Sequence, residues 1–212
     1  MCYTGIKMDD QIKQAIEALK KGGIVAFPTD TVYGLGASAF DEEAVAKVYR
    51  AKKRPCHLAL PLLLGDVSQI KDVARDVPEI AWRLAERFLP GALTLVLHKT
   101  PSVSSLITGG GENVAVRVPD HPIPIALIEG LGAPITGTSA NLSGSPSPLT
   151  ADEVYRQMGD RVDLIIDGGR CPAGVSSTVI DLTGESPRIL REGAISREEI
   201  FRTIRWALLR GS

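Results

Sequence analysis

The densest local charge in the chain is the segment 50–54, which reads Arg-Ala-Lys-Lys-Arg and carries four cations in five residues. Concentrated positive charge suits a polyphosphate, and an arginine fork can hold a phosphate or carboxylate at two points. If residues 52–54 are extended, Lys52 and Arg54 point to the same side. The same cations also suit a solvated helix end, because positive charge stabilises the carboxyl end of a helix. Charge alone leaves both interpretations open.

Small polar side chains lie beside apolar runs in three other segments. Hydroxyl and amide groups that follow a strand can hold a phosphate or a sugar, or they can form a turn that only shapes the loop. Arg117 stands between Val116 and Val118, an alternation that turns it toward a groove or toward an acidic partner. The polar residues concerned are Thr29, Thr31 and Tyr33 in the loop 28–34, Thr138, Ser139 and Asn141, and Ser176 and Ser177 with Arg191 shortly after them.

Several familiar site motifs are absent from the sequence. It contains no GxxxxGK[ST] phosphate loop and no HExxH, and none of its three histidines lies in a triad context. The segment 34–39 matches a dinucleotide fingerprint loosely, but the preceding apolar run already ends at Phe27. We therefore interpret that segment as a glycine-rich turn.

The composition is that of a globular protein, with 212 residues, 44% hydrophobic and 23% charged. The net charge is −1, so any affinity for phosphate or RNA must come from local clustering. No apolar run approaches the ~20 residues of a membrane span, and residues 1–10 lack the apolar core of a signal peptide. The cysteines Cys2, Cys56 and Cys171 are scattered without metal-ligand spacing, which favours a reducing cytoplasm over a zinc site or disulfide framework.

Helical and strand patterns alternate along the chain, which predicts an α/β fold with a mixed sheet. Without a long linker, we expect one domain over residues 1–212, with 143–148 as a surface loop. Helices are expected at 10–21, 41–53, Val77–Phe88, Ile123–Glu129, Ala151–Met158 and Arg197–Leu209. Asp9 or Asp10 is expected to cap the first helix, and the last two open with capping boxes at Thr150/Glu153 and Ser196/Glu199. Strands are expected at Ile24–Phe27, Leu58–Leu64, Leu93–His98, Val114–Val118, Pro134–Thr138, Leu164–Ile166, Thr178–Leu182 and Arg188–Leu190, with residues 28–39 as a loop.

Taken together, these segments resemble the YrdC-like family of threonylcarbamoyl-AMP synthases, from about Ile12 to Ile195. Each motif is weak alone, but their order along the chain is specific. The family's KxR motif appears as 52–54, its VRxPxHP pattern as 116–122, its SxN motif as 139–141, its STVxD pattern as 177–181, and its strand-and-loop pattern as 23–36; a proline-glycine segment at 88–94 and an arginine-glycine pattern at 190–195 complete the set.

The resemblance implies a twisted sheet of parallel and antiparallel strands with flanking helices and a concave basic cavity, in the short single-domain form. It also implies an enzyme, a nucleotidyltransferase that converts L-threonine, bicarbonate and ATP to threonylcarbamoyl-AMP and pyrophosphate. A downstream tRNA threonylcarbamoyl transferase system would then use the product. Mg²⁺ would be carried by the phosphates, because the sequence shows no dedicated carboxylate cluster.

The resemblance also implies roles for individual residues. Lys52 and Arg54 are expected to be catalytic, acting on the phosphates and the threonine carboxylate. The threonine pocket is expected to comprise Thr29, Thr31, Tyr33, Arg54, Thr138 and Ser176, and the ATP site Lys52, Arg54, Arg117, Ser139, Asn141, Ser177 and Arg191.

The chain departs from the family pattern after Pro55. Relatives continue with a small polar residue, Asp, and then Lys or Asn, where this chain has Cys56, His57 and Leu58. A polar contact near the phosphates is therefore either missing or supplied by His57.

Two other functions remain open. An RNA-binding module of the same fold would take up tRNA or double-stranded RNA without turnover, although 5% aromatic residues offer few stacking platforms. A carbamoyl-adenylate-forming paralogue would use carbamoyl phosphate, but such domains occur in longer chains with zinc-finger-like cysteines.

Overall fold

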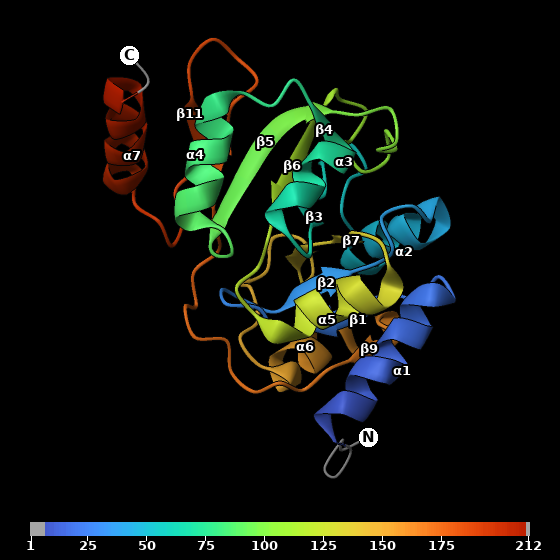
Figure 1. The fold of residues 1–212 in the computed structure, drawn as a ribbon. Helices are drawn as coiled ribbons and strands as arrows, with labels where there is room; N and C mark the ends of the chain where they lie inside the picture. Colours follow the sequence, from blue (N-terminus) through green and yellow to red (C-terminus); the bar gives the residue numbers. More distant parts are fainter. Residues whose placement is uncertain (1–6, 211–212) are drawn as a thin grey trace.

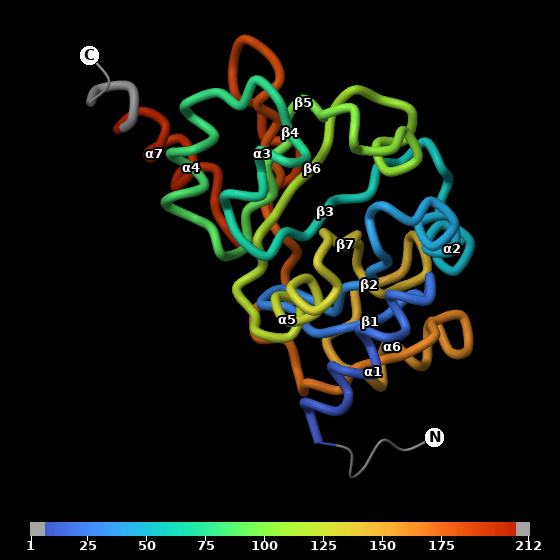
Figure 2. The backbone as a smooth tube through the Cα atoms, turned by 45° about the vertical axis from the view of Figure 1, so that its right-hand side comes forward, coloured from blue at the N-terminus to red at the C-terminus, as the bar shows by residue number. Residues whose placement is uncertain are grey.

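The computed structural model describes residues 7–210 of the chain, with side chains up to residue 206. Its strands form two sheets with helices packed against them (Figure 1). A view turned by 45° keeps the two groups apart, with α4 beside the upper strands and α1 and α5 beside the lower ones (Figure 2). The predicted mixture of parallel and antiparallel strands is confirmed, but the strands divide between two sheets where one was expected.

The smaller sheet has the strand order β8-β2-β1-β9. β1 runs antiparallel to β2 and parallel to β9. Successive side chains of β1 face two different cores. Val25 and Phe27 pack in a cluster with residues of α1 and α5, whereas Ala26 belongs to the larger core with residues of α2 and α6. The strands are β1 (Val25–Phe27), β2 (Gly34–Gly36), β8 (Thr138–Ser139) and β9 (Leu164–Ile165).

The larger sheet has the order β11-β10-β5-β6-β3-β7, and β4 pairs with β5. Two of its pairings are parallel, β10 with β5 and β3 with β6, and the others are antiparallel. The strands are β3 (Leu62–Leu63), β4 (Ala74–Arg75), β5 (Leu93–Lys99), β6 (Asn113–Arg117), β7 (Ile135–Thr136), β10 (Thr178–Asp181) and β11 (Arg188–Arg191).

Six helices form where the apolar stripes and caps predict them, whereas the helix at Ile70–Val73 was not predicted. The hydroxyls of Thr150 and Ser196 accept the predicted capping bonds from the amides of Glu153 and Glu199. The helices are α1 (Met8–Lys20), α2 (Glu42–Lys52), α3 (Ile70–Val73), α4 (Glu79–Phe88), α5 (Pro122–Leu131), α6 (Ala151–Met158) and α7 (Arg197–Arg210), with short 3₁₀ turns at Val67–Gln69 and Gly159–Arg161. The predicted cap of the first helix is wrong, because Lys7 is the N-cap and Asp9 and Asp10 lie in the first turn.

Two predicted strands are shorter or divided. In the expected strand Leu58–Leu64, only Leu62–Leu63 pairs, because side chains of Tyr49 and Arg54 take the carbonyls of residues 58 and 59. The expected strand Pro134–Thr138 is split at Gly137 between β7 in the larger sheet and β8 in the smaller one. A Cβ on Gly137 would lie 2.3 Å from Cγ of Leu63, so only glycine allows this close approach.

The expected loop 28–39 contains a strand, β2, that the sequence did not predict. Glycine is depleted in strands, which favoured a loop. In the structure the ring of Phe27 covers Gly34 and Gly36, and a Cβ on either residue would lie within 2.9 Å of that ring. The aromatic side chain thus supplies the packing that the glycines lack.

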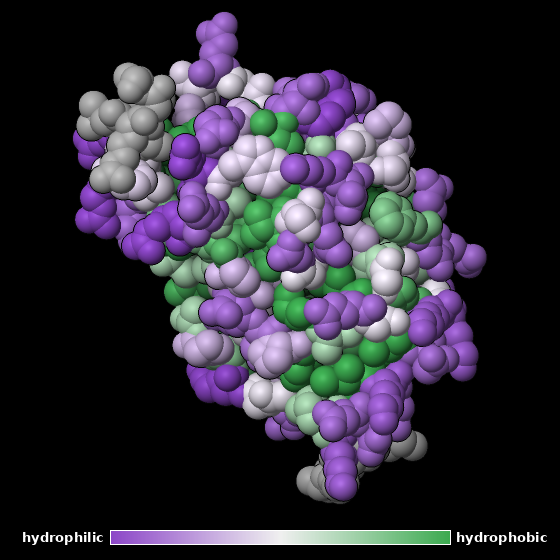
Figure 3. Space-filling view, viewed as in Figure 1, coloured by the Kyte–Doolittle hydropathy of each residue, from purple (hydrophilic) through white to green (hydrophobic). Residues whose placement is uncertain are grey.

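The two sheets meet at one corner, where Ser38 bridges to Ile135 and Thr136 exchanges hydrogen bonds with Ala37. Polar residues cover most of the face in Figure 3, with apolar residues visible between them. No helix in the described part of the chain has the length and apolar character of a membrane span. Cys56 is exposed and Cys171 is buried, and Cys2 lies outside the described residues.

Candidate active site

A cavity of about 200 Å³ lies between the two sheets. Both sheets contribute to its wall. The smaller one does so through the loop after β1 and through β8, the larger one through β3, β5, β6, the two residues before β10 and the last residue of β11. Segments that are far apart in the sequence therefore meet here. The lining residues are Thr31, Val32, Arg54, Ala59, Pro61, Leu63, Thr94, Arg117, Gly137, Thr138, Ser139, Ser176, Ser177 and Arg191.

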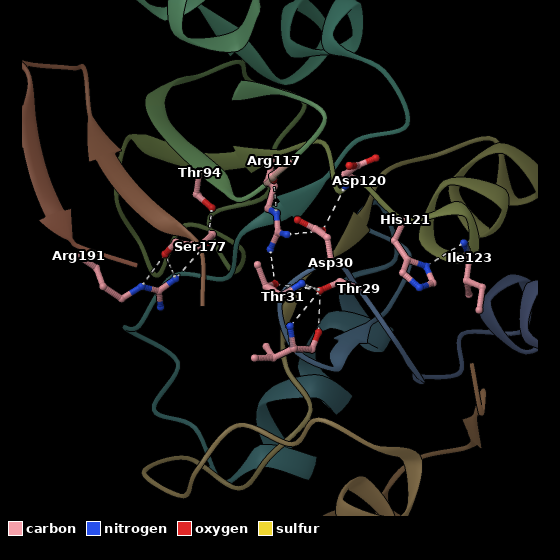
Figure 4. A network of polar contacts seen from close by, with 12 residues as sticks. Thr29, Asp30, Thr31, Thr94, Arg117, Asp120, His121, Ile123, Ser177 and Arg191 are labelled. Carbon is pink, nitrogen blue, oxygen red and sulfur yellow. Dashed lines mark hydrogen bonds and ion pairs between the residues drawn. The ribbon is translucent and has the colours of Figure 1, made fainter. Parts of the chain in front are cut away.

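Arg117 holds the loop after β1 in place (Figure 4). Its Nη2 forms a 2.5 Å ion pair with Asp30, its Nη1 donates to the hydroxyl of Thr31 at 2.9 Å, and its Nε donates to the carbonyl of Gly91 at 2.9 Å. Burial lowers the pKa of Arg117, and the adjacent Asp30 carboxylate acts in the opposite direction. Arg117 thus faces the cavity and also has an acidic partner, so both interpretations of its alternating position apply.

Arg54 supports the segment that follows α2. Its Nε donates to the carbonyl of Leu58 at 3.2 Å and its Nη2 to that of Ala59 at 2.9 Å. The hydroxyl of Tyr49 also donates to the carbonyl of Leu58, so two side chains hold the same turn. In the described residues the remaining nitrogen, Nη1, has no hydrogen-bond acceptor, so the guanidinium retains donor capacity beside the cavity.

Arg191 forms the opposite side of the cavity. Its Nε and Nη2 donate to the carbonyl of Ser177 at 3.1 and 2.9 Å, and Nη2 also reaches the Ser177 hydroxyl at 3.2 Å. That hydroxyl lies 2.8 Å from the hydroxyl of Thr94 on β5 (Figure 4). Thr94 was not among the predicted site residues, although it lies within the proline-glycine motif.

Lys52 differs from the prediction, because its ammonium lies behind the cavity wall. Residues 52–54 are not extended: Lys52 ends α2 and Lys53 has the left-handed φ of 51°. Nζ of Lys52 donates to the backbone carbonyls of Ser139 and Asn141. Burial, and then the charge of Arg54, lowers the pKa of Lys52 to about 7, while the hydrogen bonds to these oxygens favour the protonated form.

Three other predicted site residues also lie behind the wall. Thr29 folds the loop, since its hydroxyl donates to the carbonyl of Val32 at 2.7 Å. Asn141 donates to the carbonyls of Leu142 and Ser145, and Tyr33 to that of Gly169. Of the predicted residues, Thr31, Arg54, Arg117, Thr138, Ser139, Ser176, Ser177 and Arg191 line the cavity.

Replacing Tyr33 with phenylalanine tests its place behind the wall. The variant loses the 2.9 Å bond to the Gly169 carbonyl, so we expect the free energy of unfolding to fall by about 1 kcal/mol. Burial is the largest cause of the raised pKa of this phenol, so the pH should not alter the effect below pH 9. Urea unfolding measures the loss. The resemblance implies that the pocket binds threonine; that affinity should stay within about twofold, and a larger loss would place Tyr33 in the pocket.

The cavity offers hydroxyl groups that the protein leaves unused. The side chains of Thr138, Ser139 and Ser176 line it and, among the residues described, make no hydrogen bond. Three arginines lie beside them, and in the described residues Asp30 is the one carboxylate that pairs with any of these arginines, through Arg117. Within residues 7–206, no group of three or more His, Cys, Asp or Glu residues could hold a metal ion. The arrangement therefore suits an anionic ligand bound by cations and hydroxyls.

The family model Sua5_yciO_yrdC, which has the description "Telomere recombination", matches residues 17–193. The chain belongs to the Sua5/YciO/YrdC family. The match covers both sheets and every cavity residue named above, so the whole site falls within the Sua5/YciO/YrdC region.

Members of the Sua5/YciO/YrdC family with a known activity are close in sequence. Threonylcarbamoyl-AMP synthases from Bacillus subtilis and Pyrococcus abyssi are each 47% identical to the chain, over 91% and 92% of its length. The chain spans only 56% and 57% of those relatives. The crystal structure of P. abyssi Sua5 complexed with L-threonine has a TM-score of 0.91 at 46% identity and covers 94% of this chain, which covers 58% of that one.

Proposed function

We propose that the protein is a threonylcarbamoyl-AMP synthase, which converts L-threonine, bicarbonate and ATP to threonylcarbamoyl-AMP and pyrophosphate. The observation that carries the proposal is the cavity, where Arg54, Arg117 and Arg191 converge with unused hydroxyls. The curated relatives with this activity, and the threonine complex of a relative with the same fold, support it.

The charge of the site suits a polyphosphate and an amino acid together. Arg54, Arg191 and the buried Lys52 face no carboxylate in the described residues, so the site has excess positive charge that anions can neutralise. A volume of about 200 Å³ suits a small substrate such as an amino acid. The nucleotide would then extend out of the cavity mouth.

In the proposed reaction, the threonine amine combines with bicarbonate to form a carbamate and water. A carbamate oxygen attacks the α-phosphorus of ATP, the bond to the bridging oxygen breaks, and pyrophosphate leaves. Negative charge develops on the phosphates, and positioned cations stabilise it without a covalent intermediate. We assign Arg54 and Arg191 to this charge, and Ser139 and Ser177 to hydrogen bonds with the phosphates.

Mg²⁺ enters the proposal as part of the substrate Mg–ATP. The polar side chains that line the site belong to arginines, serines and threonines, which are not the carboxylate ligands that a resident Mg²⁺ requires. We propose that Thr31, Thr138 and Ser176 contact the threonine. The use of the product by a tRNA threonylcarbamoyl transferase system, direct RNA binding, a cytoplasmic location and a single domain over residues 1–212 stay predictions.

Calorimetric titration of the 212-residue chain tests the substrate assignment. L-threonine should bind, D-threonine should bind at least tenfold more weakly, and carbamoyl phosphate should not compete with either. Competition by carbamoyl phosphate would favour the carbamoyl-adenylate paralogue. Salt-dependent RNA binding without threonine binding would favour the RNA-binding module.

A further inference from the structure

The ammonium of Lys52 makes all of its hydrogen bonds to one segment of the protein. Lys52 is 1% exposed, and no ion pair to a carboxylate involves it in the described chain. Nζ donates to the carbonyl of Ser139, to the carbonyl of Asn141 at 2.7 Å and to Oδ1 of Asn141 at 3.4 Å. An ammonium has three donors, and these three acceptors use all of them. No donor is left for a ligand.

The segment that Lys52 holds is part of the cavity wall. Ser139 lines the cavity, and its hydroxyl makes no hydrogen bond within the described residues. A further hydrogen bond joins this segment to the end of α2, because the amide of Ser143 donates to the carbonyl of Lys52 at 3.0 Å. Segment 139–143 is thus fixed to the end of α2, from which the chain continues to Arg54.

We propose that Lys52 is a positioning residue, which holds the carbonyls of Ser139 and Asn141 away from the cavity and does not touch the substrate. The inference rests on the proposed function. Carbonyl oxygens carry partial negative charge, so without Lys52 they can turn toward the phosphates and oppose their binding. With Lys52 in place, the wall presents the Ser139 hydroxyl beside Arg54.

The protonation state of Lys52 gives this role a measurable signature. A neutral amine has two donors, so it releases one of the three oxygens that the ammonium holds. Arg54 is the charged group that acts on Lys52; segment 139–143 carries no charged side chain, and Arg50 and Lys53 at the same helix end are exposed. Since the pKa of Lys52 is about 7 and an anionic ligand favours the ammonium, ATP affinity should fall from pH 7 to pH 9.

The same range of pH should change the stability of the fold in the opposite direction. The pKa of Lys52 is lower in the folded chain than its ordinary value of 10.5, so the folded state binds fewer protons than the unfolded state in this range. The free energy of unfolding should therefore rise from pH 7 to pH 9. Stability that rises while ATP affinity falls separates positioning from support of the fold.

Calorimetry with Mg–ATP at pH 7 to 9 tests the proposal on the wild type, Lys52→Met and the exposed neighbour Lys53→Met. We expect Lys52→Met to bind ATP about tenfold to 100-fold more weakly at pH 7 and to lose the pH trend. Lys53→Met should match the wild type. If Lys52→Met does not fold, the wild-type protein still decides: stability that rises from pH 7 to 9 shows that Lys52 loses its proton in this range, and an ATP affinity that stays flat over the same range would then overturn the proposal.

A double-mutant cycle with Ser139→Ala, which removes the hydroxyl that the wall presents to the cavity, separates positioning from direct contact. If Lys52 acts through segment 139–141, the double variant should bind ATP no more weakly than the weaker single variant. Additive losses would mean that Lys52 contacts phosphate by itself, and would overturn the inference. A wild-type protein that binds no ATP would contradict the proposed function itself, whereas ATP binding unchanged in Lys52→Met would overturn only this inference.

Discussion

Replacing Arg54 with leucine should lower the rate of threonine-dependent pyrophosphate release by a factor on the order of 10²–10³. The guanidinium lines the cavity and retains Nη1 for a ligand, while Nε and Nη2 hold the carbonyls of Leu58 and Ala59. The change therefore removes a charge that, in the proposed reaction, stabilises the departing pyrophosphate, and it frees the adjoining turn. Arg54→Lys should not restore the rate, because an ammonium lacks the planar fork that serves both tasks.

The matched control is Arg50→Leu, an exposed arginine one helical turn earlier. It removes the same charge and should change the rate by less than about twofold, since screened surface charge acts weakly. Steady-state kinetics with saturating ATP and threonine give both values. An Arg54→Leu enzyme within tenfold of the wild type would exclude Arg54 from the reacting centre.

Replacing Asp30 with alanine should lower the free energy of unfolding by about 3 to 5 kcal/mol. The Asp30 and Arg117 side chains are only 16% and 8% exposed, so the variant leaves a guanidinium charge buried without its counter-ion. Asp30 also accepts the amide of Asp120, so the turn that leads into α5 loses an anchor. Urea unfolding followed by circular dichroism measures the loss.

Two comparisons test whether the buried, unpaired charge of Arg117 causes the loss of stability in Asp30→Ala. Removing both charges in Asp30→Ala/Arg117→Leu should recover part of the stability, because no buried charge then remains uncompensated. Glu79→Ala breaks the surface pair with Arg83, whose side chains are 74% and 49% exposed, and should cost less than about 1 kcal/mol. A loss for Asp30→Ala no greater than that for Glu79→Ala would show that the buried pair is not a stabilising element.

The sequence predicted the class of fold because local signals and tertiary packing agree along most of the chain. Asp41 caps α2 as an acidic first turn suggests, and the hydroxyls of Thr150 and Ser196 cap α6 and α7. The failures occur where packing overrides propensity. β2 forms from a glycine-rich stretch because the ring of Phe27 lies over it, and the side chain of Leu63 beside Gly137 divides a predicted strand between two sheets.

The site could be predicted as a set of segments but not as a set of contacts. The order of the motifs predicted a shared site for Thr31, Arg54, Arg117, Ser139 and Arg191, and in the structure these residues line one cavity. Spacing alone could not show that Lys53 turns left-handed and sends Lys52 behind the wall. Asp30 lay next to predicted residues, and a buried arginine in need of a counter-ion is the signal that could have identified it.

Pyrophosphate release by the 212-residue chain tests the central claim most directly. The purified protein is incubated with Mg–ATP, L-threonine and bicarbonate, with each omitted in turn, and the adenylate product is identified by mass spectrometry. The account predicts pyrophosphate and a threonylcarbamoyl-AMP mass only when all three substrates are present. Pyrophosphate release that does not depend on threonine or bicarbonate, or no release from a protein that binds both ATP and threonine, would contradict it.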